Sequence, residues 1–343
     1  MEYGAIDLHT KESEIRIVTG DGAVVFERRI ATTRARLTDV FGSRAPLRIL
    51  LESGTGGEWV AQHLEGLGHE VVVADPNYAP MYGQRTRRIK TDRRDVAALA
   101  EANRLGVYRP AHRVSTAQRD VRRRLRVRDQ LVHMRRQAIN LLRAQLRSEG
   151  VRVPTGAAET FAARFMRAEA SAAVRSAMAP LLELLAAVAP LIAQAEQWTR
   201  SAARADAVTR RLMTAPGVGP VVALAYQATV DEVGRFATPG AVTSDLGLVP
   251  RENSSGERQR KGALTKSGPS RMRVLLIQSA WHLWRSPAGS ATLHAWARRL
   301  GDRRGRRIAV VALARRIARI LWAMWRDSRD FEPARVGRLV VAA

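Results

Sequence analysis

The sequence predicts a mixed α/β domain followed by a region made of α-helices. Strand-like and helical segments alternate over the first hundred residues, one helical periodicity runs from residue 116 to residue 149, and apolar helical segments dominate the last third. The chain has 343 residues, of which 46% are hydrophobic, and is therefore long enough for two or three domains with sizeable cores.

The N-terminal segments occur in a recognisable order. The five strand-like segments are residues 3–7, 14–18, 23–30, 48–52 and 70–74. The helical patterns are residues 32–41, 58–67 and about 91–105, the last capped by Thr91 or Asp92. Three consecutive valines in the last strand-like segment predict a strand buried on both faces. This order of elements is that of a ribonuclease-H-like fold, in which the first and fourth strands are neighbours.

The helical stretch that follows combines an apolar stripe with a basic surface. Its apolar positions step by three, four or seven residues, as in a coiled coil, and are Val121, Leu125, Val132, Ile139, Leu142 and Leu146. Arginines crowd the other faces, and the candidate nucleic-acid contacts among them are Arg122, Arg123, Arg124, Arg126 and Arg128. Such a face binds phosphates without reading base sequence, and a merely solvated face is the alternative.

The charge and the absence of cysteine narrow the possible functions. Lysine and arginine number 57 against 32 acidic residues, a net charge of +25, which favours a polyanionic partner such as nucleic acid. A chain without cysteine has no disulfides, thiolate zinc sites or cysteine nucleophiles. Any metal must have oxygen or imidazole ligands, which favours Mg²⁺ or Mn²⁺ held by carboxylates. We see no apolar run of membrane-spanning length and no signal peptide, so we expect a cytoplasmic protein and no membrane partner.

Four acidic residues are candidate metal ligands. Asp7 and Glu52 end the first and fourth predicted strands, and Asp92 and Asp95 share one face at the start of a predicted helix. If that helix covers the ends of the two strands, the four carboxylates converge and can hold divalent cations for phosphoryl chemistry. The alternative is that they are ordinary surface acids. We interpret the nearby His9 as a loop residue rather than a ligand.

A glycine motif in the last third is a second candidate contact with nucleic acid. Gly217 and Gly219 precede an apolar helix over residues 221–229, and such a turn exposes backbone N–H groups that can bind phosphate, as in helix-hairpin-helix modules. A plain interhelical turn is an equally supported interpretation. Tryptophans farther along could stack on bases, but their helical spacing favours core positions.

A basic segment with two adjacent serines follows. Residues 253–256 (NSSG) precede the cations Arg258, Arg260 and Lys261. A serine hydroxyl here can attack a phosphodiester if a base or metal activates it and cations stabilise the leaving charge. From composition alone, a solvated loop that touches phosphate is the favoured interpretation.

Together these motifs resemble a known transposase family. Residues 6–13 (IDLHTKES), 51–56 (LESGTG) and 90–95 (KTDRRD) are similar to the DEDD motifs of the insertion-sequence family numbered one hundred and ten, the bridge-RNA-guided recombinases. Residues 216–219 (PGVG) and 247–256 (GLVPRENSSG) resemble its C-terminal transposase domain. The resemblance covers nearly the whole chain, and the motifs occur in the order of the family.

The resemblance implies three regions and a set of roles. The regions are a RuvC-like DEDD domain (residues 1–110), a helical coiled-coil linker that helps to dimerise the chain (111–208) and an all-α transposase domain with a helix-hairpin-helix-like element (209–343). The implied metal-binding and catalytic carboxylates are those of Asp7, Glu52, Asp92 and Asp95. The implied nucleophile is Ser255, and the adjacent Ser254 is the alternative. Implied partners are donor and target DNA, a structured noncoding guide RNA and further copies of the chain in a dimer or tetramer, in association with the bacterial nucleoid.

We therefore expect a transposase that cleaves and rejoins DNA through a serine–phosphate intermediate with carboxylate-bound Mg²⁺. Two alternatives remain. One is a metal-dependent nuclease of the Holliday-junction type, in which water attacks the phosphate. The other is a non-catalytic basic scaffold that binds nucleic acid. A covalent protein–DNA adduct separates the first from the second, and metal-dependent nicking separates both from the third.

Overall fold

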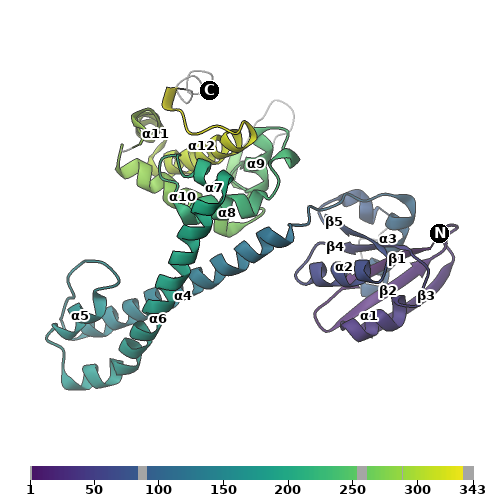
Figure 1. Cartoon of the computed structure of the whole chain (residues 1–343), viewed down its shortest axis with the longest axis horizontal. Coiled ribbons are helices and arrows are strands. Elements are labelled where there is room, and N and C mark those ends of the chain that lie inside the picture. The colour runs from purple at the N-terminus through teal and green to yellow at the C-terminus, as the bar shows by residue number, and fades with distance from the viewer. Residues whose placement is uncertain (1, 84–90, 253–260, 288, 335–343) are drawn as a thin grey trace. The chain divides into compact units, whose positions relative to one another are not determined.

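The structure is a computed structural model that describes residues 2–83, 91–252, 261–287 and 289–334. The chain divides into two compact units, Met1–Val114 and Ser115–Ala343. Figure 1 shows a sheet with flanking helices in the N-terminal unit and a mainly helical second unit.

A five-stranded sheet organises the N-terminal unit. Its strands are β1 (Tyr3–Leu8), β2 (Glu12–Val18), β3 (Val24–Ala31), β4 (Arg48–Glu52) and β5 (Glu70–Ala74). Their order across the sheet is β3-β2-β1-β4-β5. β2 pairs antiparallel with β1 and β3, whereas β4 pairs parallel with β1 and β5. The arrangement is consistent with the predicted ribonuclease-H-like fold, and the predicted pairing of the first and fourth strands is confirmed.

Helices cover both faces of this sheet. They are α1 (Arg34–Phe41), α2 (Gly57–Gly66) and α3 (Asp92–Leu105), with the short 3-10 helix η1 (Ala79–Tyr82). Leu37 of α1 and Val60 of α2 pack with Ile6 on one face. On the opposite face Leu99 of α3 packs with Ala5. The core of the N-terminal unit therefore has two layers, one on each side of the sheet.

One burial prediction for the sheet was wrong. The last strand was expected to be buried on both faces, yet Val71 and Val72 are only half-buried and Val73 is buried. The reason is that β5 is the edge strand of the sheet, and only its end, at Val73 and Ala74, meets a second segment, at Pro110 and Ala111.

A buried amide sets the direction of α3 across the sheet. The side-chain nitrogen of Asn103, which is fully buried, donates hydrogen bonds to the backbone oxygens of Gly4 (2.8 Å) and Arg48 (2.9 Å). Both acceptors lie at the starts of their strands. The eight residues from Asn103 back to Asp95 span about 12 Å of helix, which equals roughly four residues of strand. The first turn of α3 is thereby placed level with the ends of β1 and β4.

Helices make up most of the second unit. They are α4 (Thr116–Ser148), α5 (Phe161–Met166), α6 (Ala172–Ala205), α7 (Ala207–Leu212), α8 (Pro220–Val230), η2 (Val233–Arg235), α9 (Pro239–Asp245), α10 (Ser270–Arg285), α11 (Ala291–Arg304) and α12 (Arg306–Arg326). α6 packs along α4, as Figure 1 shows. The predicted stripe of α4 is largely confirmed, because Leu125, Ile139, Leu142 and Leu146 are buried. Leu125 belongs to the large core of α8 to α12, and the other three pack with residues of α5 and α6.

Polar contacts anchor the chain on both sides of the boundary between the units. Arg113 donates hydrogen bonds to Glu58 (3.1 and 3.2 Å) and Glu65 (3.0 Å) of α2. Ser115 caps α4 and donates from its backbone nitrogen (2.8 Å) and its hydroxyl (2.7 Å) to the carboxylate of Asp231. Asp231 ends α8 with a φ of +62°. A single residue, Val114, separates the two anchored positions.

Two features of the second unit differ from the expectations. β6 (Pro250–Glu252) and β7 (Lys261–Leu264) pair antiparallel through backbone hydrogen bonds, so this region is not all-α. α6 is long and apolar enough to cross a membrane by length and composition, and only 17% of its most apolar window is buried, so the expectation that no such run exists was wrong. A single helix of this kind is weak evidence for a membrane span, because helices of water-soluble proteins pass the same test.

We predict that Asn103→Ala loosens α3 from the sheet. The variant loses two buried hydrogen bonds and leaves two carbonyl oxygens without that donor, so we expect a loss of roughly 2–4 kcal/mol in the free energy of unfolding. Hydrogen exchange followed by mass spectrometry should become faster in peptides from β1, β4 and α3. Asn140→Ala, on the exposed surface of α4, is the control. Equal exchange rates in the two variants would contradict this role of Asn103.

Candidate functional site

Asp7 and Glu52 occupy corresponding places at the ends of β1 and β4. Each comes one residue after the last parallel pair of these strands, Ile6 and Leu51. Side chains alternate between the two faces of a sheet, and this pair lies on the face that α3 covers. The strand register alone therefore brings two carboxylates to one edge of the sheet, under one helix.

The first turn of α3 contributes two more carboxylates to this region. The hydroxyl of Thr91 accepts a hydrogen bond from the backbone nitrogen of Arg94 (3.3 Å), so Thr91 is the cap, one of the two predicted possibilities. Asp92 and Asp95 lie in the first turn, where the helix dipole favours negative charge. Asp92 is half-exposed and Asp95 is buried.

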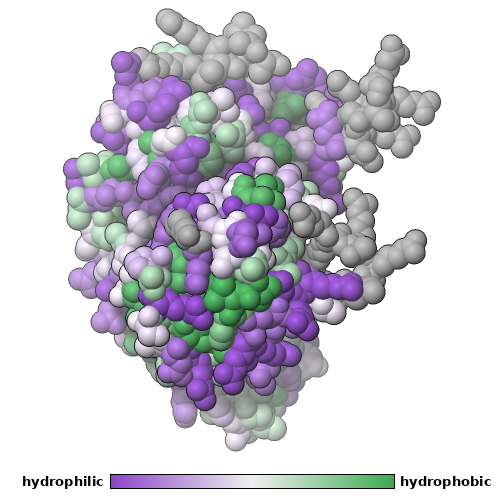
Figure 2. Space-filling model, turned by 90° about the vertical axis from the view of Figure 1, so that its right-hand side faces the viewer, coloured by the Kyte–Doolittle hydropathy of each residue, from purple (hydrophilic) through white to green (hydrophobic). Residues whose placement is uncertain are grey.

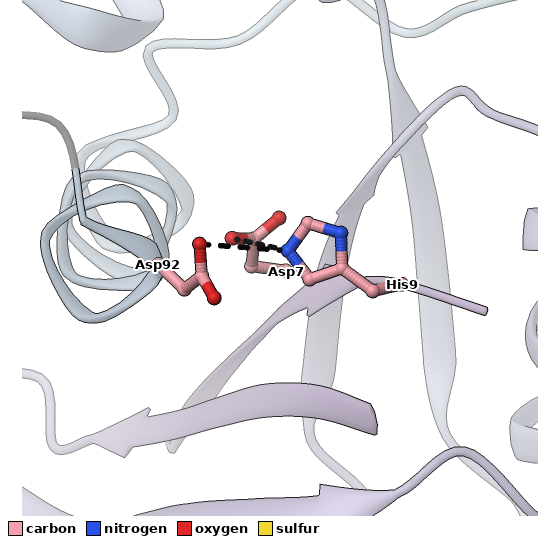
Figure 3. Close-up of side chains that lie close together, drawn as sticks. All are labelled: Asp7, His9 and Asp92. Atoms are coloured by element: carbon pink, nitrogen blue, oxygen red, sulfur yellow. Dashed lines mark ion pairs between the residues drawn. The ribbon is translucent and has the colours of Figure 1, made fainter. Parts of the chain in front are cut away.

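Three side chains meet closely at this edge. The Nε2 atom of His9 lies 3.5 Å from Oδ2 of Asp7 and 3.6 Å from Oδ1 of Asp92. One potential ligand atom from each of the three lies within 4.8 Å of the others. Figure 3 shows the side chains turned toward one another, Asp92 from α3 and the other two from the end of β1 and the residue beyond it. The predicted approach of Asp7 and Asp92 is thus seen in the structure.

His9 was missed as a member of this cluster. It had been interpreted as a loop residue, and it does lie just beyond the end of β1, at Leu8. The signal that would have found it is its spacing, because a residue two positions after Asp7 points to the same face while the chain stays extended.

Glu52 and Asp95 are not part of the three-residue cluster. The carboxylate of Glu52 accepts a hydrogen bond from the hydroxyl of Tyr82 in η1, which orients it. Asp95 is 6% exposed, and its backbone nitrogen donates to Thr91 (3.0 Å) within the helix cap. The structure thus brings two of the four predicted carboxylates together with a histidine.

A fifth acid lies beside the cluster. Glu14 of β2 is the direct partner of Asp7 in the antiparallel register. Burial raises the pKa of its carboxyl; Arg29 opposes this shift, and the negative charges of Glu27 and Asp92 add to it. Negative charge is therefore concentrated at this edge of the sheet, in a chain that is otherwise strongly basic.

The donor set fits a divalent cation. Two carboxylates and one imidazole supply oxygen and nitrogen ligands within reach of one ion. Mg²⁺ prefers oxygen ligands and water, whereas Mn²⁺ accepts an imidazole more readily, so the presence of His9 favours Mn²⁺ relative to an all-carboxylate site. A bound cation would also offset the repulsion among Asp7, Glu14 and Asp92.

Comparison with known proteins identifies the family. The DEDD transposase model of the IS110 type matches residues 5–149, and the model of the IS116/IS110/IS902 transposase family matches residues 209–295. A probable family 20 transposase of Pseudomonas aeruginosa is 30% identical over 339 residues, which are 96% of this chain and 98% of the relative. The chain belongs to the IS110 family of DEDD transposases. The N-terminal match contains all four predicted carboxylates of this transposase, and the C-terminal match contains Gly217, Gly219 and Ser255.

Other relatives match this transposase over similarly large parts of both chains. The transposase for insertion sequence element IS1111A of Coxiella burnetii is 28% identical, over 88% of this chain and 84% of its own length. The transposase for IS1328 of Yersinia enterocolitica is 26% identical, over 93% of this chain and 95% of its own length. The likeness therefore extends through both units of the transposase and is not confined to one motif.

The arginines of α4 divide into structural and exposed groups. Arg122 is partly buried, donates to the backbone oxygens of Ala228 (2.7 Å) and Thr229 (3.3 Å), and has its pKa lowered by burial. It therefore caps the end of α8 instead of offering a free phosphate contact as expected. Arg128 pairs with Glu196 (3.0 Å), and Arg124 pairs with Asp120 (3.1 Å).

Arg123 and Arg126 are the arginines of this set that remain open to a partner. Both are exposed, and neither has an ion-pair partner in the part of the chain that the structure describes. Figure 2 shows one face of the molecule, on which hydrophilic side chains predominate around a smaller hydrophobic patch. The chain as a whole carries a net charge of +25, and exposed guanidinium groups such as those of Arg123 and Arg126 suit contact with phosphates.

Gly217 and Gly219 differ in their surroundings. Gly217 has a φ of +76°, and an added Cβ would lie 3.1 Å from the backbone oxygen of Ser279 in α10, so the turn requires glycine here. Gly219 is the N-cap of α8, and an added Cβ there would meet open space. The turn thus packs on its own unit at Gly217 and is open at the helix N-terminus.

The serine segment lies outside the described residues. Ser254, Ser255, Arg258 and Arg260 belong to residues 253–260, and Lys261 is described only as the first residue of β7.

The interpretation of the tryptophans as core residues is supported, since Trp322 and Trp284 are buried. Arg326 and Arg298 lie over their rings, each 4.4–4.5 Å from the ring centre.

We predict that Asp7→Asn removes stabilisation of the transposase by metal. Mg²⁺ or Mn²⁺ at a hundred times its dissociation constant stabilises a folded protein by about 2.7 kcal/mol, so the melting temperature of the parent chain should rise with metal and fall again with a chelator. Asp7→Asn should show little response, and without metal it should be at least as stable as the parent because one like-charge repulsion is gone.

Two further variants make this test specific. Asp39→Asn, at an exposed acid that pairs with Arg36 (3.1 Å), should respond to metal as the parent does. His9→Ala keeps both carboxylates and should weaken Mn²⁺ binding more than Mg²⁺ binding. A full metal response in Asp7→Asn would show that no metal binds at this cluster.

Proposed function

We propose that this transposase cleaves and rejoins DNA strands through a covalent serine–phosphate bond, with a divalent cation at the carboxylate site. The observation that carries the proposal is the meeting of Asp7, His9 and Asp92 at the end of β1. Support also comes from the two family matches, which contain the acidic motifs and the serine segment. The net charge of +25 supplies long-range attraction for DNA.

The hydroxyl of Ser255 is the proposed nucleophile. Its oxygen bonds to the phosphorus of a DNA strand, the bond from phosphorus to the leaving deoxyribose oxygen breaks, and that oxygen takes up the proton that the serine loses. In rejoining, the hydroxyl of another strand attacks the phosphorus and the serine oxygen leaves. The number of phosphodiester bonds is therefore unchanged. Bound Mg²⁺ or Mn²⁺ supplies stabilisation of the charge that develops on the phosphate oxygens.

The remaining site residues have positioning and binding roles in this proposal. Asp7 and Asp92 are the proposed ligands in the observed cluster, and Glu52 and Asp95 join them from the same strand and helix ends. Tyr82 orients Glu52 through its hydrogen bond, as outer residues commonly do for metal ligands. Arg123, Arg126 and the open N-terminus of α8 at Gly219 are proposed to contact phosphates.

The organisation inferred from the family resemblance is part of the same proposal. It comprises a RuvC-like region at residues 1–110, a coiled-coil region at 111–208 that contributes to a dimer or tetramer, and a transposase region at 209–343. A structured noncoding RNA is proposed to select donor and target DNA, and the site of action is the bacterial nucleoid in the cytoplasm. The chain's basic surface suits both nucleic acids, because both attract cations through phosphate.

We predict that cleavage leaves the protein bound to DNA through Ser255. Peptide mapping of the trapped adduct should place the link on that residue, and Ser255→Ala should lower cleavage by roughly a thousandfold or more while DNA binding persists. Ser254→Ala is the matched control and should cleave nearly normally. An adduct on Ser254 would move the assignment by one residue. Metal-dependent cleavage without an adduct, undiminished in Ser255→Ala, would instead show a nuclease that uses water.

We predict that the exposed arginines of α4 determine part of the salt dependence of binding. The double variant Arg123→Gln, Arg126→Gln should lower the slope of log affinity against log salt by up to about two units, since each phosphate contact contributes nearly one. Arg122→Gln should instead lower the melting temperature, because it removes the contacts with α8, and should leave the slope nearly unchanged. A double variant with the slope of the parent would show that this face does not contact phosphate.

We predict that one noncoding RNA binds more tightly than bulk RNA at physiological salt, where purely electrostatic binding is weak. Sequencing of RNA that co-purifies with the chain should therefore find one dominant, structured species. Ribonuclease treatment should abolish recombination, and adding back that RNA should restore it. Random cellular fragments together with full activity after ribonuclease treatment would contradict a guide RNA.

A further inference from the structure

The second unit contains a cavity at α12 that the proposed chemistry does not use. It has a volume of about 710 Å³ and is lined mainly by α12, by Trp296 of α11 and by the segment that follows α12. This volume is within the range of pockets that hold a small organic ligand. The carboxylate cluster belongs to the other unit, so the cavity needs a separate explanation.

Three of the arginines that line this cavity are clustered on α12 and form its cationic part, whereas the acids Asp327, Asp330 and Glu332 line it beyond the helix. The three arginines are Arg315, Arg316 and Arg319, which lie within two turns of α12. Burial lowers the pKa of Arg315 and Arg316, and the charge of Arg319 lowers both further. Arg315 is held by a hydrogen bond from its Nε to the backbone oxygen of Leu248 (2.7 Å). Three guanidinium groups this close suit an anion with several oxygens, such as a phosphate.

Two tryptophans, Trp296 and Trp322, line the cavity near these arginines and form its aromatic wall. Trp322 is 2% exposed, and among the described residues its indole Nε1–H has no hydrogen-bond acceptor. A buried donor without an acceptor costs free energy, so a ligand that supplies an acceptor there gains affinity. Trp322 comes three residues after Arg319 on one helix face, a rise of about 4.5 Å. Trp296 is half-buried beneath Arg316, whose guanidinium lies 4.4 Å from the ring centre.

We propose that this cavity binds one unpaired nucleotide of a nucleic-acid strand. The phosphate lies at Arg315, Arg316 and Arg319, the base packs against the apolar and aromatic wall, and Trp322 donates a hydrogen bond to it. An anion, a flat apolar ring and a hydrogen-bond acceptor within a short distance are the features of a nucleotide. Bases of a duplex are stacked and paired, so only an extruded or single-stranded nucleotide can enter. The proposal uses the family membership of the chain but neither Ser255 nor the metal site.

Tryptophan indole signals provide a direct test in the full-length chain. The seven tryptophans give seven indole N–H resonances after ¹⁵N labelling, and Trp322→Phe identifies the signal of Trp322. The probes are five-nucleotide single strands of DNA and of RNA, and a blunt-ended DNA duplex in which every base is paired. Single strands should shift the Trp322 resonance and slow exchange of its proton, whereas Trp59 of the N-terminal unit should not respond. The stronger of the DNA and RNA effects identifies the source of the nucleotide.

Matched arginine variants complete the experiment. Arg319→Gln should weaken the single-strand effect by about tenfold, the loss expected when a hydrogen bond to a charged group is removed. Arg307→Gln removes the same charge from an exposed position of α12 outside the cavity and should change the affinity less than about twofold. The Ser255→Ala protein should bind as the parent does, which separates this result from failure of the recombination chemistry. An unmoved Trp322 signal, an equal effect of the blunt-ended duplex, or equal losses in the two arginine variants would overturn the proposal.

Discussion

Two hydrogen bonds from one buried amide determine which end of α3 lies over which end of the sheet. Leucine and alanine contacts hold a helix on a sheet but tolerate sliding, because the hydrophobic effect is not directional. The amide of Asn103 binds two particular carbonyl oxygens, of Gly4 and Arg48, and so selects one register. The consequence appears about 12 Å away, at the first turn of the helix. There Asp92 is held close to Asp7 although their charges repel, because the anchoring contact lies outside the repulsive cluster.

The distribution of arginine shows why net charge overstates the surface available to nucleic acid. Arg122 caps α8. The 9% exposed Arg273 donates hydrogen bonds to the backbone oxygens of Leu246, Ser267 and Gly268, at 2.7 to 3.2 Å. These guanidinium groups donate hydrogen bonds to backbone carbonyl oxygens at helix ends and turns inside the second unit. A planar group with five donors can bind several carbonyls at once. The sequence does not distinguish the arginines that bind carbonyl groups inside the unit from those that remain exposed to a partner. Only the fold makes this distinction.

Local periodicity was enough to predict most elements of the N-terminal unit. The bounds of β4 and β5 agree with the predicted residues 48–52 and 70–74, and α3 begins directly after one of its two predicted caps. What could not be predicted depends on contacts between residues far apart in the sequence. The half-burial of Val71 follows from the edge position of β5, and the internal role of Arg122 follows from the end of α8 reaching α4. His9 was missed because its side-chain direction depends on where β1 ends, which alternation alone does not specify.

The anchors at Arg113 and Ser115 limit the length of the connection between the two units. Arg113 is held by α2 in one unit, and Ser115 is held by Asp231 in the other. Consecutive Cα atoms are 3.8 Å apart, so the two held residues can never be more than about 7.6 Å from each other. The joint therefore has almost no length of its own. Inserting a few glycines at this point would lengthen it without touching a side chain of either unit.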